Sequence, residues 1–156
     1  MPPQVMTPVQ ILLVEDQAGD ILLARHVLAE HLVPVKVHAA MDGQQAVGML
    51  ADPSFQPDLI ILDLNIPRIS GHELLEQCKM RDVPVVVFSS SWNETDSRRA
   101  LELGARDYVR KPIDIDDYTH AVFGMIDKWA TSKNNSEVYR ALLSCLRHVD
   151  RMSGRP

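Results

Sequence analysis

Five short apolar runs, separated by segments with helical spacing, constrain the fold of this 156-residue chain more than any other feature. Three successive runs, residues 33–40, 57–63 and 83–89, are nearly unbroken in Val, Ile and Leu, which is typical of strands covered on both faces. The other two runs are residues 9–14 and 106–110. The pattern therefore predicts a parallel sheet of five strands.

The intervening segments have the spacing of amphipathic helices. The first of them places Ile21, Leu22, Val27 and Leu28 on one side, and Gly104 is a plausible terminator of the fourth. The predicted helices cover residues 20–32, 44–50, 72–80, 94–103 and 114–129. Strand and helix alternate five times, and right-handed crossovers in such a chain give an α/β sandwich with helices on both faces of the sheet.

Polar side chains follow four of the predicted strands. Glu15 and Asp16 end the first strand, Asp63 the third, Ser89 the fourth and Lys111 the fifth. In open parallel sheets ligands bind beyond the carboxyl ends of the strands, where the strand order reverses. We therefore expect these five side chains to lie on one edge of the sheet.

Three carboxylates on one edge indicate a bound cation. Glu15, Asp16 and Asp63 repel one another unless a cation lies among them, and Mg²⁺ prefers a few carboxylates, a carbonyl and several waters. The backbone carbonyl of Asn65 is placed to complete that set. The cluster predicts a Mg²⁺ site with open coordination positions.

A metal-bound carboxylate facing a lysine and a hydroxyl is typical of phosphoryl chemistry. Asp63 would attack a phosphoryl donor to form an aspartyl phosphate, while Mg²⁺ and Lys111 neutralise the transferring oxygens and Ser89 donates a hydrogen bond to one of them.

Each of these residues also has a purely structural interpretation. Glu15 and Asp16 can cap a helix, Ser89 can bond to backbone, Lys111 can be a solvated charge and Asp63 can form a turn before Pro67. Their joint placement at the ends of four strands favours the functional interpretation.

Composition narrows the classes of partner. Sixteen basic and twenty-one acidic residues give a net charge of −5 with no block of like charge, so no nucleic-acid footprint is visible. The amino terminus lacks a basic and an apolar signal region, and no apolar run is long enough to cross a membrane. Cys78 and Cys145 both fall in helical patterns and are expected to be buried small apolar residues. These features predict a soluble cytoplasmic protein.

The last segment of the chain begins with a polar linker and then shows helical spacing. Val138, Leu142, Cys145 and Val149 would form an apolar face that covers the domain or another subunit. One helix is too short for a DNA-binding domain with its own core. The expected organisation is a flexible segment at 1–8, one domain at 9–130, and a linker plus helix at 131–156, without a separate effector domain.

Four motifs in order resemble the receiver domain of bacterial response regulators over roughly residues 9–129. They are ILLVEDQ, LIILDLNIPRISG, VVVFSS and GARDYVRKP. The resemblance implies a flavodoxin-like, doubly wound sheet with strand order 2-1-3-4-5 and five helices, to which the predicted C-terminal helix is added.

The resemblance also assigns roles to the residues of one site. Asp63 would be the phosphoacceptor, Glu15, Asp16 and the Asn65 carbonyl would hold Mg²⁺, Ser89 and Tyr108 would be the switch residues, and Lys111 would contact the phosphoryl group. A cis peptide would precede Pro112, as it does in this family.

The function implied is that of a signalling switch rather than an enzyme. A sensor histidine kinase or phosphotransfer protein would phosphorylate Asp63, and the surface of the fourth helix, fifth strand and fifth helix would change to control a partner. That surface or the C-terminal helix is a possible homodimer interface, and neither nucleic acid nor membrane is an expected partner. The stretches SSSWNE and DKWA are similar to stand-alone regulators paired with bacterial phytochrome-type kinases.

Two alternatives stand beside this interpretation. A constitutive interaction or dimerisation module would bind Mg²⁺ in the acidic pocket but pass no signal. A phosphatase of the haloacid dehalogenase type would need a second Asp two residues after its nucleophile, where this chain has Asn65.

Overall fold

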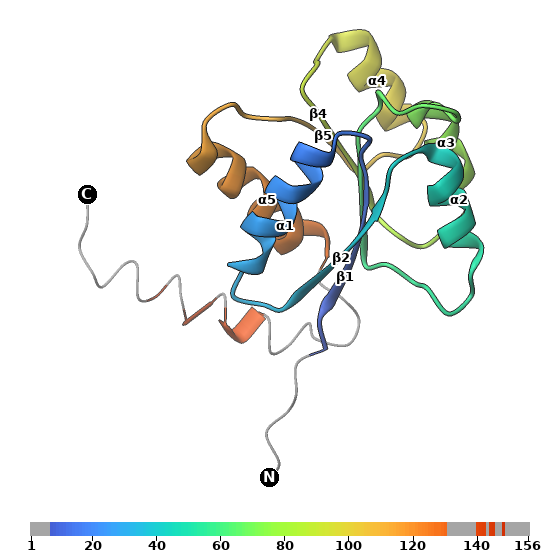
Figure 1. Ribbon diagram of the computed structural model, residues 1–156. Coiled ribbons are helices and arrows are strands. Elements are labelled where there is room, and N and C mark those ends of the chain that lie inside the picture. Colours follow the sequence, from blue (N-terminus) through green and yellow to red (C-terminus); the bar gives the residue numbers. More distant parts are fainter. Residues whose placement is uncertain (1–6, 131–139, 143, 146–147, 149–156) are drawn as a thin grey trace.

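The computed structural model describes residues 7–130, 140–142, 144–145 and 148. Its centre is a parallel sheet of five strands in the order β2-β1-β3-β4-β5, as the resemblance implies (Figure 1). The strands are β1 (Val9–Val14), β2 (Val35–Ala40), β3 (Leu59–Leu62), β4 (Val85–Ser89) and β5 (Asp107–Arg110). All five predicted strands are confirmed, with boundaries within two residues of the apolar runs.

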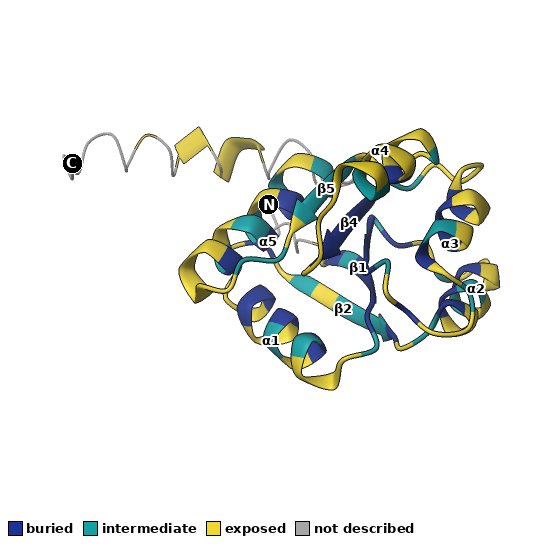
Figure 2. Cartoon of the chain, turned by 90° about the horizontal axis from the view of Figure 1, so that it is seen from above, coloured by how far each residue is buried: buried dark blue, intermediate teal, exposed yellow. Residues whose placement is uncertain are grey.

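Five helices cover the two faces of the sheet. They are α1 (Ala18–Ala29), α2 (Gly43–Ala51), α3 (Gly71–Cys78), α4 (Glu94–Glu102) and α5 (Ile115–Trp129). Figure 2 shows α1 and α5 on one face and α2, α3 and α4 on the other. The fold is therefore the doubly wound, flavodoxin-like α/β arrangement predicted from the sequence.

Alternation along the inner strands sends side chains into two separate cores. On β3, Leu59 and Ile61 face α1 and α5, whereas Ile60 and Leu62 face the other helices. Because both faces are covered, β1, β3 and β4 are almost wholly buried, which explains their unbroken apolar sequences.

The interpretation of residues 33–40 as a strand covered on both faces is wrong. β2 is an edge strand, and most of its side chains are only half-buried. An edge strand has a neighbouring strand on one side only, and this leaves its side chains partly exposed. The apolar run at residues 33–40 does not show whether the strand lies at the edge or inside the sheet.

Local signals set the helix ends. The Asp42 side chain caps α2, and Ser70 and Glu73 form a reciprocal capping box at the start of α3. Gly104 has φ = 105° directly after the last turn of α4, which confirms it as the terminator. Leu22 is 67% exposed, so its predicted place on the buried face of α1 is wrong; the neighbouring Ile21 takes that face.

The cysteine prediction is half correct. Cys78 is buried, but Cys145 is exposed, and both are free thiols. The predicted tail helix lies largely outside the described residues, Val138 and Val149 included. Its described residues are helical, and Leu142 and Cys145 are exposed, so these two do not pack on the core as expected.

Among the described residues the backbone has no cis peptide bond, so the expected cis peptide before Pro112 is wrong. The trans form is the lower-energy form of an X–Pro bond, by roughly 0.5–1 kcal/mol. Within the same residues, none of the helices is both long and apolar enough to cross a membrane.

Candidate functional site

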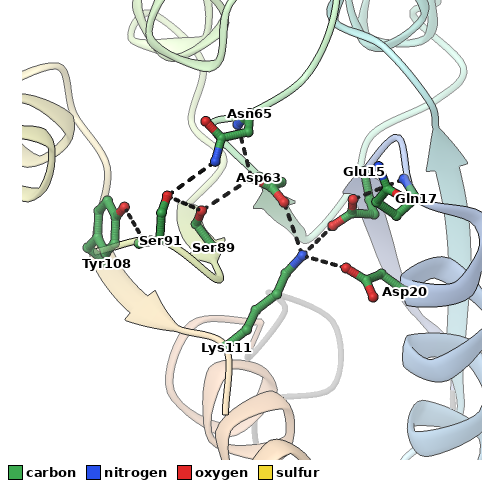
Figure 3. Close-up of polar contacts among 9 residues, drawn as sticks. All are labelled: Glu15, Gln17, Asp20, Asp63, Asn65, Ser89, Ser91, Tyr108 and Lys111. Carbon is green, nitrogen blue, oxygen red and sulfur yellow. Dashed lines mark hydrogen bonds and ion pairs between the residues drawn. The ribbon is translucent and has the colours of Figure 1, made fainter. Parts of the chain in front are cut away.

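The polar residues after the strands meet at the carboxyl edge of the sheet (Figure 3). Backbone pairing continues one residue past the strands: the amide of Glu15 donates to Ala40, that of Asp63 to Val14, and that of Lys111 to Ser89. The sheet therefore fixes the backbone from which these side chains project.

Lys111 is the cationic centre of the site. Its ammonium donates to Glu15 Oε2, to Asp20 Oδ2 at 3.0 Å and to Asp63 Oδ2 at 3.0 Å. Burial alone would lower the pKa of Lys111, but hydrogen bonds to Glu15 and Asp20, with the charge and hydrogen bond of Asp63, raise it above its ordinary value. Lys111 is therefore a permanent positive charge that uses all three of its donors.

Glu15 is a buried carboxylate, with only 2% of its surface exposed. Its Oε1 accepts a hydrogen bond from the Gln17 backbone N–H at 3.1 Å, and its Oε2 accepts from Lys111. Burial raises the pKa of Glu15, partly offset by the hydrogen bond from Lys111. Its charge is therefore costly to the folded state.

Asp63 is held on both of its oxygens. Oδ1 accepts from the Asn65 backbone N–H at 3.0 Å and from Ser89 Oγ at 3.3 Å, while Oδ2 accepts from Lys111. Asp63 is 7% exposed and Ser89 is fully buried. The carboxylate that closes β3 is therefore fixed between a hydroxyl and an ammonium, as the sequence predicts.

A second group of contacts joins Tyr108 to the site through Ser91. The Tyr108 hydroxyl donates to the Ser91 carbonyl at 2.9 Å, and Asn65 Nδ2 donates to Ser91 Oγ at 3.2 Å. Ser91 Oγ lies 3.3 Å from Ser89 Oγ (Figure 3). Burial, followed by the charge of Asp96, raises the pKa of Tyr108, so this phenol is a neutral hydrogen-bond donor.

The donor set suits a hard divalent cation. Glu15, Asp20 and Asp63 bring three carboxylates to one edge, against the single charge of Lys111. With the Asn65 carbonyl they offer only oxygen ligands, which Mg²⁺ and Mn²⁺ prefer. In the part of the chain that the structure describes, no three His, Cys, Asp or Glu side chains are arranged to hold a metal ion. The Lys111 ammonium lies between the carboxylates of Glu15 and Asp63.

The structure thus brings most of the predicted site residues together. Glu15, Asp63, Ser89 and Lys111 are in direct contact, and Tyr108 is joined to them through Ser91. Asp16 is half-exposed at the same edge.

Sequence reasoning missed one residue of the site, Asp20. This residue lies in the first turn of α1, whereas Asp16 precedes the helix, so no helical spacing links the two. Ser91, two residues after Ser89, flanks the site, as its place in the run of three serines suggests.

An α/β domain of this topology with acidic strand ends and a lysine after β5 defines the receiver class of signalling proteins. The response regulator receiver domain matches residues 11–123, and the chain belongs to this family.

Among its relatives is response regulator Rcp1 of Synechocystis sp. (strain ATCC 27184 / PCC 6803 / Kazusa). It is 34% identical over 131 residues, which cover 78% of this chain and 89% of Rcp1. The crystal structure of the phosphorylated cyanobacterial phytochrome response regulator RcpA is 34% identical, covers 79% of this chain and 94% of RcpA, and has a TM-score of 0.73. The Mn²⁺-bound form of Rcp1 is 33% identical, covers 80% of this chain and 96% of Rcp1, and has a TM-score of 0.71.

The family confirms the class of function expected from the motifs. The chain is a receiver domain of a two-component response regulator and serves phosphorylation-based signalling. Receiver domains bind a divalent metal and interact with histidine kinases or phosphotransfer proteins.

Proposed function

We propose that this chain is a phosphorylation-dependent switch whose phosphoacceptor is Asp63. The observation that carries the proposal is the placement of this carboxylate, which ends β3 between Ser89 Oγ and Lys111 Nζ. The phosphoryl group comes from a sensor histidine kinase or a phosphotransfer protein.

The proposed step is an in-line displacement at phosphorus. One carboxylate oxygen of Asp63 forms a bond to phosphorus, the bond from phosphorus to the donor nitrogen breaks, and its electron pair leaves with the donor imidazole. Lys111 would neutralise the oxygens of the transferred group and Ser89 would donate a hydrogen bond to one of them, a role that their contacts with Asp63 support.

Mg²⁺ is the metal that we propose for this step, with Glu15, Asp16, Asp63 and the Asn65 carbonyl as the residues that hold it. The bound ion would supply further positive charge to the transferring oxygens. The excess of carboxylates over cations at this edge supports the assignment. Binding of Mg²⁺ would require the carboxylates of Glu15 and Asp63 to contact both the ion and the Lys111 ammonium.

The switch would pass through Ser89 and Tyr108. A phosphoryl group on Asp63 adds acceptor oxygens that attract the Ser89 hydroxyl, and Ser89 is next to Ser91, whose carbonyl holds Tyr108. Tyr108 lies on β5, so a shift in its position changes the surface made by α4, β5 and α5.

That surface is also the proposed site of output. Three large apolar side chains on it or beside it are exposed: Leu101 on α4, and Ile113 and Ile115 at the start of α5. They suit a protein partner or a second copy of the chain. Trp92, in the loop after β4, is 55% exposed.

A phytochrome-type histidine kinase is the proposed donor. Support comes from the cyanobacterial phytochrome response regulator RcpA, which is 34% identical to this chain. The proposed organisation is a receiver at 9–130 in the cytoplasm, with the linker and helix at 131–156 available for dimerisation.

Intact-mass analysis tests the phosphoacceptor. Wild type incubated with acetyl phosphate and Mg²⁺ is expected to gain one phosphoryl group, and Asp63→Asn is expected to gain none. Asp58→Asn is the matched control, because Asp58 precedes β3 at the opposite edge of the sheet and bonds to the Gln10 amide there. It should be phosphorylated like wild type.

Two results contradict the proposal. An adduct of equal yield on Asp63→Asn would place the phosphoryl group elsewhere. A wild-type chain that binds Mg²⁺ but takes no phosphoryl group would favour the constitutive interaction module.

A further inference from the structure

Asp20 contacts the cationic centre of the site from a helix that the phosphoryl chemistry does not otherwise use. It lies in the first turn of α1, and its Oδ2 accepts from Lys111 Nζ at 3.0 Å across 91 residues of sequence (Figure 3). Its side chain is 45% exposed, whereas that of Lys111 is 10% exposed. Asp20 therefore covers the outer side of an otherwise buried ammonium.

We propose that Asp20 is a positioning residue that fixes the ammonium of Lys111 for contact with the phosphoryl group on Asp63. The inference rests on the proposed role of Asp63 and extends it. Asp20 itself touches neither the phosphorus nor its oxygens in the proposed step.

The first argument concerns the flexibility of lysine. Lys111 carries its charge on a four-carbon stem with several rotatable bonds, so an unrestrained ammonium occupies many positions. Phe88 lies beneath the ammonium, with its ring centroid 5.9 Å from Nζ. The Glu15 and Asp20 carboxylates bind the head from β1 and α1, which leaves the third N–H directed at Asp63.

The second argument concerns the rigidity of Asp20. It belongs to the hydrogen-bonded first turn of α1, whose N-cap, Gln17, provides no side-chain cap. A carboxylate in the first turn is stabilised by the partial positive charge of the helix amino terminus. Asp20 is thus held by its helix and in turn holds Lys111.

Charge and hydrogen bonding at Asp20 act in opposite directions on phosphorylation. The negative charge repels the incoming phosphoryl group, which carries about −2 when attached. The hydrogen bond orients Lys111 to receive it. Asp20→Asn removes the charge and keeps a carbonyl acceptor, whereas Asp20→Ala removes both, so of these two effects only the hydrogen bond to Lys111 differs between the variants.

The experiment compares the rates at which the two variants gain a phosphoryl group from acetyl phosphate with Mg²⁺, measured by intact mass on the full chain. Asp20→Ala is expected to react about fivefold more slowly than Asp20→Asn, the effect of losing one hydrogen bond. Asp116, an exposed acidic residue in the first turn of α5, supplies matched controls. Asp116→Asn and Asp116→Ala should react at equal rates.

A second readout separates positioning from general stability. The ammonium protons of Lys111, followed by nitrogen-15 NMR, should exchange with water faster in Asp20→Ala than in Asp20→Asn. Thermal unfolding midpoints of these two variants should differ by no more than the difference in helix propensity between Ala and Asn, because the residue is partly exposed.

The outcomes distinguish the positioning role of Asp20 from the phosphoacceptor role of Asp63. If wild type gains no phosphoryl group, the role of Asp63 fails and the inference about Asp20 falls with it. If wild type and Asp20→Asn react but Asp20→Ala reacts as fast as Asp20→Asn, only the positioning role of Asp20 is overturned.

Discussion

The ionisable residues at the carboxyl edge are arranged for binding at the expense of stability. Three carboxylates share one ammonium, and the most deeply buried of them, Glu15, is 2% exposed. Burial raises its pKa above the ordinary value of 4.5. A raised carboxyl pKa means that the folded state favours the protonated form, so the stabilisation is complete below the unfolded-state pKa and is lost as pH rises through the folded-state pKa.

Glu15→Gln is therefore expected to stabilise the metal-free protein at pH 7. Glutamine keeps an oxygen acceptor for Lys111 or the Gln17 amide and removes the buried charge. The expected gain in the free energy of unfolding is about 1 kcal/mol, the usual order for one residue. Urea unfolding in EDTA measures it, and the gap to wild type should close near pH 4, where Glu15 is protonated.

Asp52 provides a control, because its pKa is shifted in the direction opposite to that of Glu15. Hydrogen bonds from Ser54 lower the pKa of this exposed carboxyl, so Asp52→Asn should not stabilise the protein at pH 7. A Glu15→Gln variant less stable than wild type at pH 7 would show that the ion pair with Lys111 outweighs the cost of burial.

At the scale of elements, local pattern predicted the strands and helices well because both faces of the inner strands are covered and the helix ends carry caps. Local pattern did not predict features that depend on contacts between segments distant in the sequence. The place of β2 at the edge follows from strand order, and the contact between Asp20 and Lys111 follows from the meeting of α1 with the residue after β5 at the carboxyl edge of the sheet. No pattern within a single segment contains either fact.

Two glycines of α2 give opposite predictions within one helix. A Cβ at Gly43 would lie 2.5 Å from the Ile69 carbonyl oxygen, which belongs to backbone, whereas a Cβ at Gly48 would have nothing within 4 Å. Gly48→Ala should raise the free energy of unfolding by roughly 0.5–1 kcal/mol through helix propensity. Gly43→Ala should lower it by about 1–3 kcal/mol, because the loop before α3 must move.

Chemical denaturation of both glycine variants tests this pair. Equal changes in the free energy of unfolding at the two positions would show that the loop containing Ile69 can move without loss of stability. Because this loop follows Asp63, the rate at which Gly43→Ala gains a phosphoryl group should fall as well.

At the scale of the whole molecule, the described residues that form the two cores all lie within residues 9–130. The core between the sheet and the α1–α5 layer extends to Ala130, which is buried, whereas the described Leu142 and Cys145 are exposed. None of the described tail residues therefore belongs to either core.

Removal of the residues after Thr131 should accordingly leave the receiver folded. The free energy of unfolding should change by less than about 0.5 kcal/mol, as for surface changes, and phosphorylation should persist. Solution mass measured on the same pair of chains tests dimerisation: a dimer that becomes a monomer on truncation would assign the interface to the tail. A large loss of stability would contradict the prediction and show that the tail packs on the domain.

The contact of Lys111 with Glu15 and Asp63 also has a consequence for synthesis of the chain. Asp63 precedes Lys111 by 48 residues and Glu15 precedes it by 96, so the ammonium is the last of the three groups to leave the ribosome. Until β5 joins the sheet, the carboxylates at its edge have no lysine among them and repel one another. A nascent domain that stops before Lys111 would therefore be held open by the same charges that are proposed to bind the metal, and the proposed phosphorylation site would be complete only when the last strand is in place.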